Sequence, residues 1–172
     1  MSSATGTARA SSGAHSAASP VSLPTIVRQV VDELATLIAA RRAVIEVGRT
    51  ADNPQARGPE QAVKQIIHHV VKNAVEASPS GGVVRVTQHE RPGQVIVEIT
   101  DEGPGISFSD FSRIFQRGYS TKSGAKGQGL ADVEWRLAEL RGGISWESPH
   151  RTGRGTCFTV TLPAAPAAPA AS

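Results

Sequence analysis

The sequence predicts an α+β fold, a two-layer α/β sandwich with a mostly antiparallel sheet and helices on one face. Two observations point to it. In some segments apolar residues recur every three or four positions, as on one face of a helix, whereas other segments read as strands that come in pairs joined by short turns. Helices separated in this way from strand pairs are typical of a helical layer packed on an antiparallel sheet.

The elements are expected in the order helix, strand, helix, hairpin, loop, helix, hairpin. Their predicted ranges are a helix over 22–43, a strand over 44–47, a helix from 58 up to a turn at 78–82, strands over 83–90 and 94–101, a short helix over 107–115, a loop over 116–127, a helix over 128–141, and strands over 144–148 and 156–162.

Periodicity and end signals support the helices. Ser22 is the expected cap of the first helix, whose apolar stripe runs through 26–38. The second helix starts at Pro59, because proline is tolerated at the first helical position, and its stripe covers 63–75.

Turn residues delimit the later elements. The first hairpin turns at Arg91-Pro92-Gly93 and the second at Gly153-Arg154-Gly155. Ser107 and Asp110 have capping-box spacing at the start of the short helix. Gly142-Gly143 ends the last helix.

Composition excludes several classes of protein. The 172 residues are 39% hydrophobic but only 4% aromatic, so the core is expected to be aliphatic. A net charge of +3 is too small to indicate nucleic-acid binding. The single cysteine, Cys157, excludes an internal disulfide framework. The strongly apolar stretch 34–40 is far shorter than the ~20 residues that span a bilayer, so we expect a cytoplasmic protein without a membrane segment.

The two ends differ from the middle of the chain. Residues 1–21 are mostly Ser, Ala, Thr and Gly, which cannot bury enough apolar surface to offset the cost of ordering, so a flexible tail is expected. This serine-rich, acid-free composition also fits a transit peptide, although one arginine is few for such a peptide. Residues 164–172 form a Pro/Ala tail. A single domain is therefore predicted over 22–163.

A candidate binding segment follows the first hairpin. In Asp101-Glu102-Gly103-Pro104-Gly105-Ile106 an acid ends a strand and two glycines follow at alternate positions. Glycine permits positive φ and close approach of the backbone to a ligand. The carboxylate can accept a hydrogen bond from an amino group such as the exocyclic amine of adenine, although a tight turn with a solvated acid explains the segment equally simply.

A second candidate segment opens the last helix. Lys126-Gly127-Gln128-Gly129-Leu130 offers backbone N–H groups at a helix start, which suit an anion. The stretch 111–131 up to its first helical turn holds four basic residues and no acidic one, a composition suited to phosphates. Gly153-Arg154-Gly155-Thr156, taken alone, is a hairpin turn.

The second helix carries His69 and Asn73 on one face, four residues apart. The amide oxygen of Asn73 is a hard ligand suited to Mg²⁺, which prefers oxygen and keeps several waters. A polar helix face with an asparagine near its end is the alternative explanation.

Together these features resemble the ATP-binding catalytic domain of sensor histidine kinases and the related gyrase/Hsp90/MutL-like ATPases. The resemblance extends from about residue 22 to residue 163. It is carried by motifs similar to the N box (72–77), the G1 box (101–106), the F box (111–115), the start of the lid (118–122), the G2 box (127–130) and the final glycine turn and strand (153–158).

The resemblance implies a Bergerat-type ATP pocket between the helices and the sheet. Asp101 would accept a hydrogen bond from the adenine amine, and Asn73 would bind Mg²⁺. Residues 116–129 would form a mobile lid over the phosphates. The residues expected at the nucleotide are Asn73, Asp101, Gly103, Gly105, Ile106, Lys122, Lys126, Gly127, Gln128, Gly129, Leu130 and Thr156.

The sequence departs from the family pattern at three points, the mildest of which is Ala131, where a glycine usually stands two residues after Gly129. Residue 69 is histidine, where the kinases usually have asparagine and the ATPases a water-activating glutamate, so vigorous hydrolysis is not expected and His69 is the only candidate for a catalytic base. None of the five histidines lies in a phosphoacceptor-like surrounding. We therefore expect a kinase domain that is inactive on itself.

The resemblance implies a two-component kinase that transfers the γ-phosphoryl of ATP to a histidine on a separate domain or partner, with a response regulator downstream. A nucleotide-dependent binding module and an anti-sigma-type Ser/Thr kinase remain as alternatives, because both can use the same pocket. Protein kinases and P-loop enzymes are disfavoured, since no Gly-x-x-x-x-Gly-Lys-Ser/Thr segment occurs.

Overall fold

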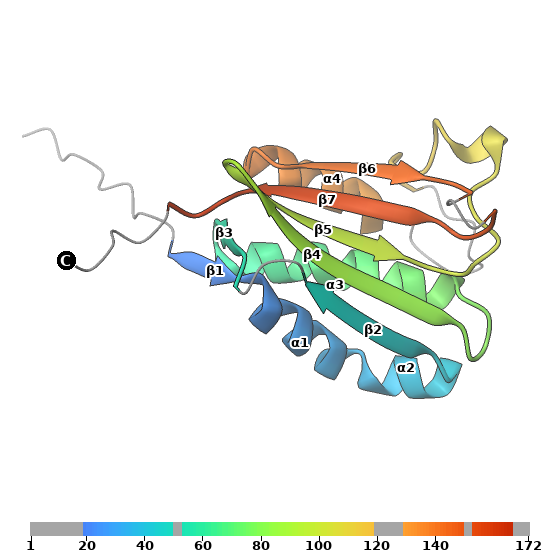
Figure 1. Ribbon diagram of the computed structural model, residues 1–172. Coiled ribbons are helices and arrows are strands. Elements are labelled where there is room, and N and C mark those ends of the chain that lie inside the picture. The colour runs from blue at the N-terminus through green and yellow to red at the C-terminus, as the bar shows by residue number, and fades with distance from the viewer. Residues whose placement is uncertain (1–18, 50–52, 119–128, 150–152, 167–172) are drawn as a thin grey trace, which may run out of the picture.

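The computed structural model describes residues 19–49, 53–118, 129–149 and 153–166, and they form the two-layer α+β sandwich that the sequence predicts (Figure 1). Its elements are β1 (Pro20–Ser22), α1 (Leu23–Glu33), α2 (Ala35–Arg41), β2 (Val44–Arg49), β3 (Gln55–Arg57), α3 (Glu60–Ala77), β4 (Val83–Arg91), β5 (Gln94–Thr100), the 3₁₀ turn η1 (Phe108–Asp110), α4 (Gly129–Glu139), β6 (Gly143–Glu147) and β7 (Cys157–Pro163).

The main sheet has the strand order β2-β4-β5-β7-β6. The pairs β4–β5, β5–β7 and β6–β7 are antiparallel, as expected for consecutive hairpins. Only β2 and β4 run parallel among the described strands, because the chain crosses over through α3 between them. The prediction of a mostly antiparallel sheet is confirmed.

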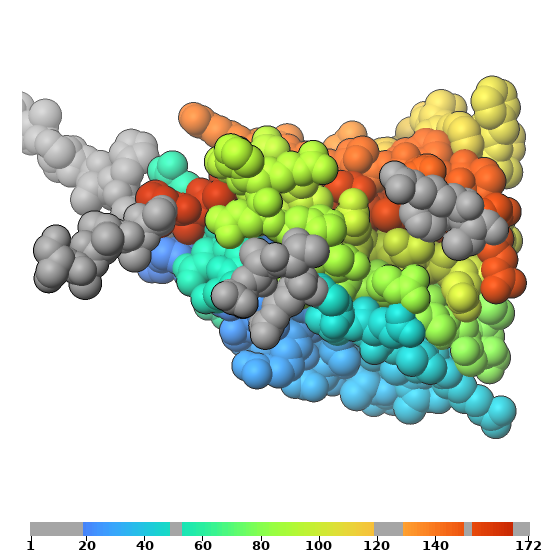
Figure 2. Space-filling view, viewed as in Figure 1, coloured from blue at the N-terminus to red at the C-terminus, as the bar shows by residue number. Residues whose placement is uncertain are grey.

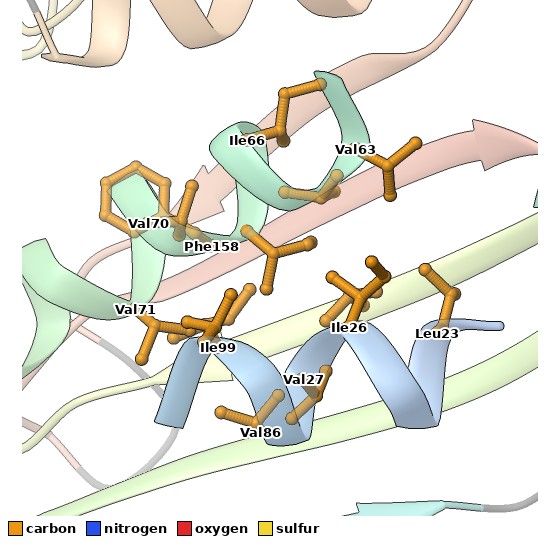
Figure 3. Close-up of a cluster of buried hydrophobic side chains, with 14 of the residues drawn as sticks. Leu23, Ile26, Val27, Val63, Ile66, Val70, Val71, Val86, Ile99 and Phe158 are labelled. Atoms are coloured by element: carbon orange, nitrogen blue, oxygen red, sulfur yellow. The ribbon is translucent and has the colours of Figure 1, made fainter. Parts of the chain in front are cut away.

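The core lies between this sheet and the helices α1 and α3. Figure 3 shows side chains of both helices pointing toward the strands, where they meet Val86, Ile99 and Phe158. The α3 stripe is fully covered, since Ile66 and Val70 are both 0% exposed. Burying one such side chain stabilises the fold by about 1.5–3 kcal/mol, so α3 is held mainly by packing.

No helix of the described residues lies in front of the other face of the sheet. Figure 2 shows this face as a surface formed by strand residues, with β2 in teal, β4 in green and β7 in red-orange. Polar pairs occupy it: Arg85 Nη2 lies 2.6 Å from Glu46 Oε2, and His89 Nε2 lies 2.8 Å from Glu98 Oε2. The helices therefore cover one face only, as the sequence predicts.

Three element predictions need correction. The helix expected over 22–43 is divided at Leu34, which leaves the helical region with φ −91° and ψ 3°. The polar loop before α3 contains the short strand β3, which pairs with β1. The short helix expected over 107–115 is the single 3₁₀ turn η1 followed by further turns.

Both described chain ends lie at the end of the sheet away from Asp101. Pro163 pairs with Gln94 at the start of β5, whereas Asp101 follows Thr100 at its end, about 20 Å away at the usual rise per strand residue. Ala164 bridges to Ala56 of β3, so residues flanking 22–163 on both sides join the fold. Among the described helices none has the length and apolarity needed to cross a membrane.

Candidate functional site

Asp101 is a buried carboxylate at the end of β5. It is 5% exposed, and its backbone N–H donates to the carbonyl of Thr156, at 2.9 Å. Its side-chain oxygen Oδ1 accepts hydrogen bonds from the backbone N–H of Gly103, at 2.8 Å, and of Thr156, at 3.2 Å. Burying a carboxylate is costly unless it is hydrogen-bonded. The two amides offset this cost and orient the Asp101 carboxylate.

The glycines around Asp101 are required by close backbone packing. A Cβ on Gly155 would lie 1.9 Å from the carbonyl oxygen of Asp101, and a Cβ on Gly103 would lie 2.7 Å from the carbonyl oxygen of Ala77. The N–H of Gly155 donates to the carbonyl of Gly103, at 2.9 Å. These contacts hold the Gly103 loop between the end of α3 and the start of β7.

The second half of the same loop is held by a side chain that the sequence analysis did not single out. The backbone N–H of Ile106 donates to Ser148 Oγ, at 2.7 Å. Gly105 adopts φ +81°, and a Cβ there would lie 2.8 Å from the same oxygen. Ser148 directly follows β6, and a serine before a proline at a strand end carries no sequence signal of this role.

Helix α3 carries His69 and Asn73 on one side, both half-buried. A Cβ placed on Gly129 would lie 3.7 Å from His69 Nδ1, so His69 lies beside the first residue of α4. Asn73 is one helical turn before Ala77, whose carbonyl oxygen borders Gly103. The face of α3 that carries both residues therefore runs from the start of α4 toward the loop after Asp101.

Burial lowers the pKa of His69 below the ordinary value of 6.5, and the positive charges of His68 and Lys72 lower it further. Arg136 acts in the same direction, and only Asp132 opposes them. The imidazole is therefore kept in its neutral form near pH 7, in which one ring nitrogen can accept a hydrogen bond.

The described residues contain no group of three or more His, Cys, Asp or Glu side chains arranged to hold a metal ion. The amide of Asn73 thus fits a metal that brings most of its ligands with it. Mg²⁺ bound to nucleotide phosphates and water is such a metal, since it is usually held by only one or two protein oxygens.

The structure describes only some of the residues that are predicted to bind the phosphates. Gly129 and Leu130 begin α4 and are half-buried, as the prediction of a helix start requires. Lys122, Lys126, Gly127 and Gln128 lie outside the described residues, as does the expected lid from 119 onward. The structure thus brings Asp101, Gly103 and Thr156 into direct contact, with Gly105 and Ile106 in the same loop.

Comparison with known proteins agrees with this arrangement. The family model for "Histidine kinase-, DNA gyrase B-, and HSP90-like ATPase" matches residues 58–166. The adaptive-response sensory kinase SasA of Synechococcus sp. (strain CC9311) is 32% identical over 148 residues, which cover 82% of this chain and 38% of SasA. This chain therefore spans less than half the length of that relative.

Solved structures share the whole fold. The mycobacterial sensor histidine kinase MprB superimposes with a TM-score of 0.74 at 26% identity, covering 86% of this chain and 97% of that one. Full-length ShkA in complex with AMPPNP superimposes with a TM-score of 0.74 at 25% identity, covering 86% of this chain and 31% of that one. Because the family model covers more than half of the chain and the fold recurs in these kinases, the chain belongs to the histidine kinase-, DNA gyrase B- and HSP90-like ATPases, as a histidine kinase ATP-binding catalytic domain.

Proposed function

We propose that this domain binds Mg-ATP and donates the γ-phosphoryl group to a histidine on a separate domain or partner protein. The observation that carries the proposal is Asp101, a carboxylate that is 5% exposed and oriented by two backbone amides at the mouth of the Gly103 loop. A carboxylate fixed in this way is suited to accept a hydrogen bond from the exocyclic amine of adenine. ShkA, which has this fold, forms a complex with the ATP analogue AMPPNP.

The other expected contacts divide between the two ends of the nucleotide. Gly103 and Thr156 contact Asp101, and Gly105 and Ile106 lie in the same loop; these four residues would contact the base. The backbone at the start of α4, with Gly127, Gln128, Gly129 and Leu130, would bind phosphates, since a helix N-terminus favours anions. Lys122 and Lys126 would add positive charge to the same phosphates.

Catalysis would rest on position and charge. The acceptor imidazole nitrogen attacks the γ-phosphorus, the bond from phosphorus to the bridging oxygen breaks, and ADP leaves with that oxygen. When bound, Mg²⁺ would supply positive charge that offsets the charge of the phosphates. Asn73 would hold that ion through its amide oxygen, and the neutral His69 would accept a hydrogen bond from Mg²⁺-bound water or border the phosphates.

The acceptor must come from elsewhere. His68 and His69 belong to α3, whose inner face is fully packed, and in-line transfer needs the acceptor nitrogen about 3–3.5 Å from phosphorus. A helix in the pocket wall cannot reach that position without unfolding. The proposal therefore includes a phosphoacceptor histidine domain, with a response regulator as the later recipient. The histidine kinase ThkA, which shares this fold, forms a complex with the response regulator TrrA.

The catalytic unit in this proposal is residues 22–163, extended by the flanking residues that pair with β3, and its expected location is the cytoplasm. Residues 1–18 and 167–172 of the proposed tails lie outside the described residues.

Titration calorimetry with ATP and Mg²⁺ tests the site. Asp101→Asn replaces an acceptor oxygen by a donor and should weaken ATP binding by about 1.5–3 kcal/mol, as for a hydrogen bond to a charged group. Glu102→Gln is the matched control, because this neighbouring carboxylate accepts from the N–H of Val83 at 3.1 Å and its amide oxygen can still do so. Unchanged affinity in Asp101→Asn would remove Asp101 from the adenine site.

A further inference from the structure

We infer that Ser148 is the positioning residue that fixes adenine recognition, by holding the Gly103–Ile106 loop on the start of β7; this rests on the function proposed above. Ser148 would not itself touch the nucleotide. It would act through the loop and through Thr156, which together set the orientation of the Asp101 carboxylate.

The hydroxyl of Ser148 meets three chain segments at once. It accepts from the backbone N–H of Ile106 at 2.7 Å, donates to the carbonyl of Gly155 at 3.2 Å, and accepts from the hydroxyl of Thr156 at 3.3 Å. A serine hydroxyl has one donor and two acceptor sites, so these contacts use its whole capacity. No smaller side chain can replace it, since alanine would lose all three.

Each contact leads back to Asp101. Thr156 donates its N–H to Asp101 Oδ1 at 3.2 Å and accepts the N–H of Asp101 on its carbonyl at 2.9 Å. Gly155 donates its N–H to the carbonyl of Gly103. The N–H of Gly103 in turn donates to Asp101 Oδ1, at 2.8 Å. The Ser148 hydroxyl thus joins Ile106, at the far end of the loop, to Thr156, which holds the carboxylate directly, and to Gly155, which is bonded to Gly103.

The surroundings leave little room for a different arrangement. Gly105 has φ +81°, and a Cβ there would lie 2.8 Å from Ser148 Oγ. Gly155 has φ +75°, and a Cβ there would lie 1.9 Å from the carbonyl oxygen of Asp101. A loop held by glycines in these conformations gains no stiffness from its own side chains, so the hydroxyl supplies a restraint that the backbone lacks.

Loss of the Ser148 hydroxyl should change how the domain selects between nucleotides. Adenine offers Asp101 its exocyclic amine, whereas purine riboside triphosphate is the same nucleotide without that amine. A misoriented carboxylate penalises only the ligand that hydrogen-bonds to it. Loss of the Ser148 hydroxyl should therefore weaken ATP binding by about tenfold and binding of the analogue by no more than about twofold.

The experiment measures both dissociation constants by calorimetry for wild type, Ser148→Ala, Ser148→Cys and Ser148→Thr, with the melting temperature of each. Ser148→Cys keeps the side-chain size but bonds weakly, so it should behave like Ser148→Ala. Ser148→Thr keeps the hydroxyl and should retain the wild-type preference for ATP. Ser145→Ala is the matched control, since this exposed serine lies on the same strand, β6, and should keep that preference.

The possible outcomes separate this inference from the proposed function. If wild type does not bind ATP, or binds it no better than the analogue, the proposed adenine contact fails and this inference with it. If wild type prefers ATP and Ser148→Cys or Ser148→Ala keeps the full preference, only the role of Ser148 is overturned. A loss that is equal for both nucleotides also overturns it, because a merely structural role predicts that result.

Discussion

At the scale of single residues, the site is organised around one oxygen atom, Asp101 Oδ1, which accepts two backbone N–H groups. The sequence could identify Asp101 and the adjacent glycines, because an acid at a strand end followed by glycines is visible in one short segment. It could not identify Ser148, since that residue is 42 positions from its partner Ile106 and only the pairing of β6 with β7 brings the segments together.

Gly155 and Gly153 provide a matched pair of substitutions. Both have positive φ, +75° and +83°, but a Cβ on Gly155 would lie 1.9 Å from the backbone of Asp101, while a Cβ on Gly153 would meet nothing within 4 Å. Gly153→Ala should cost about 1 kcal/mol of unfolding free energy, from backbone strain alone. Gly155→Ala should cost at least about 2 kcal/mol more. Urea unfolding measures both, and equal costs would contradict the packing described.

His69 should make stability depend on pH. Its pKa is lowered in the folded state by burial and by His68 and Lys72, so the unfolded chain binds a proton more readily. The contribution of neutral His69 to the unfolding free energy is therefore fully present above the unfolded pKa of about 6.5. It is lost as the pH falls below that value toward the folded pKa. His69→Gln should lose less unfolding free energy than wild type between pH 7.5 and pH 5.5. Identical losses in urea titrations would show that His69 is not the group responsible.

At the scale of elements, the sequence predicts the long, periodic segments and misses short ones. Helix α3 and the hairpin strands β4 and β5 follow from strong patterns. The break at Leu34 does not, because apolar spacing continues through it and Ile38 still donates its N–H to the carbonyl of Leu34, at 2.9 Å. Strands β1 and β3 have three residues each, too few for any periodicity, and exist because they pair with each other.

Truncating an apolar side chain should cost more stability in α1 than in α2, the two halves of the first predicted helix. Ile26 on α1 is 1% exposed and points into the core in Figure 3, whereas α2 has no fully buried residue and Leu37 is only partly covered. Ile26→Ala should cost about 2–5 kcal/mol of unfolding free energy. Leu37→Ala should cost clearly less, because less of the side chain leaves water on folding. Similar costs in denaturant titrations would indicate that α2 packs as tightly as α1.

At the scale of the whole molecule, the described chain ends lie at one end of the sheet, whereas β5 ends at the other (Figure 1). Asp101 directly follows the end of β5. Segments attached at either described end would therefore join the domain away from Asp101. In the function proposed above, a separate domain or protein brings the acceptor histidine to the phosphates. The chain, which spans 38% of the length of SasA, contains no such acceptor in a suitable surrounding.

Phosphoryl transfer from labelled ATP measures whether this domain phosphorylates histidine. The chain is incubated with Mg-ATP alone, and then with a set of helical hairpins that carry a phosphoacceptor histidine, and the products are analysed by mass spectrometry at neutral pH. We expect an acid-labile phosphate on a hairpin histidine and none on the chain itself. An acid-stable phosphate on serine or threonine would contradict it. So would a stoichiometric adduct on the chain that disappears in His69→Ala while ATP binding is retained.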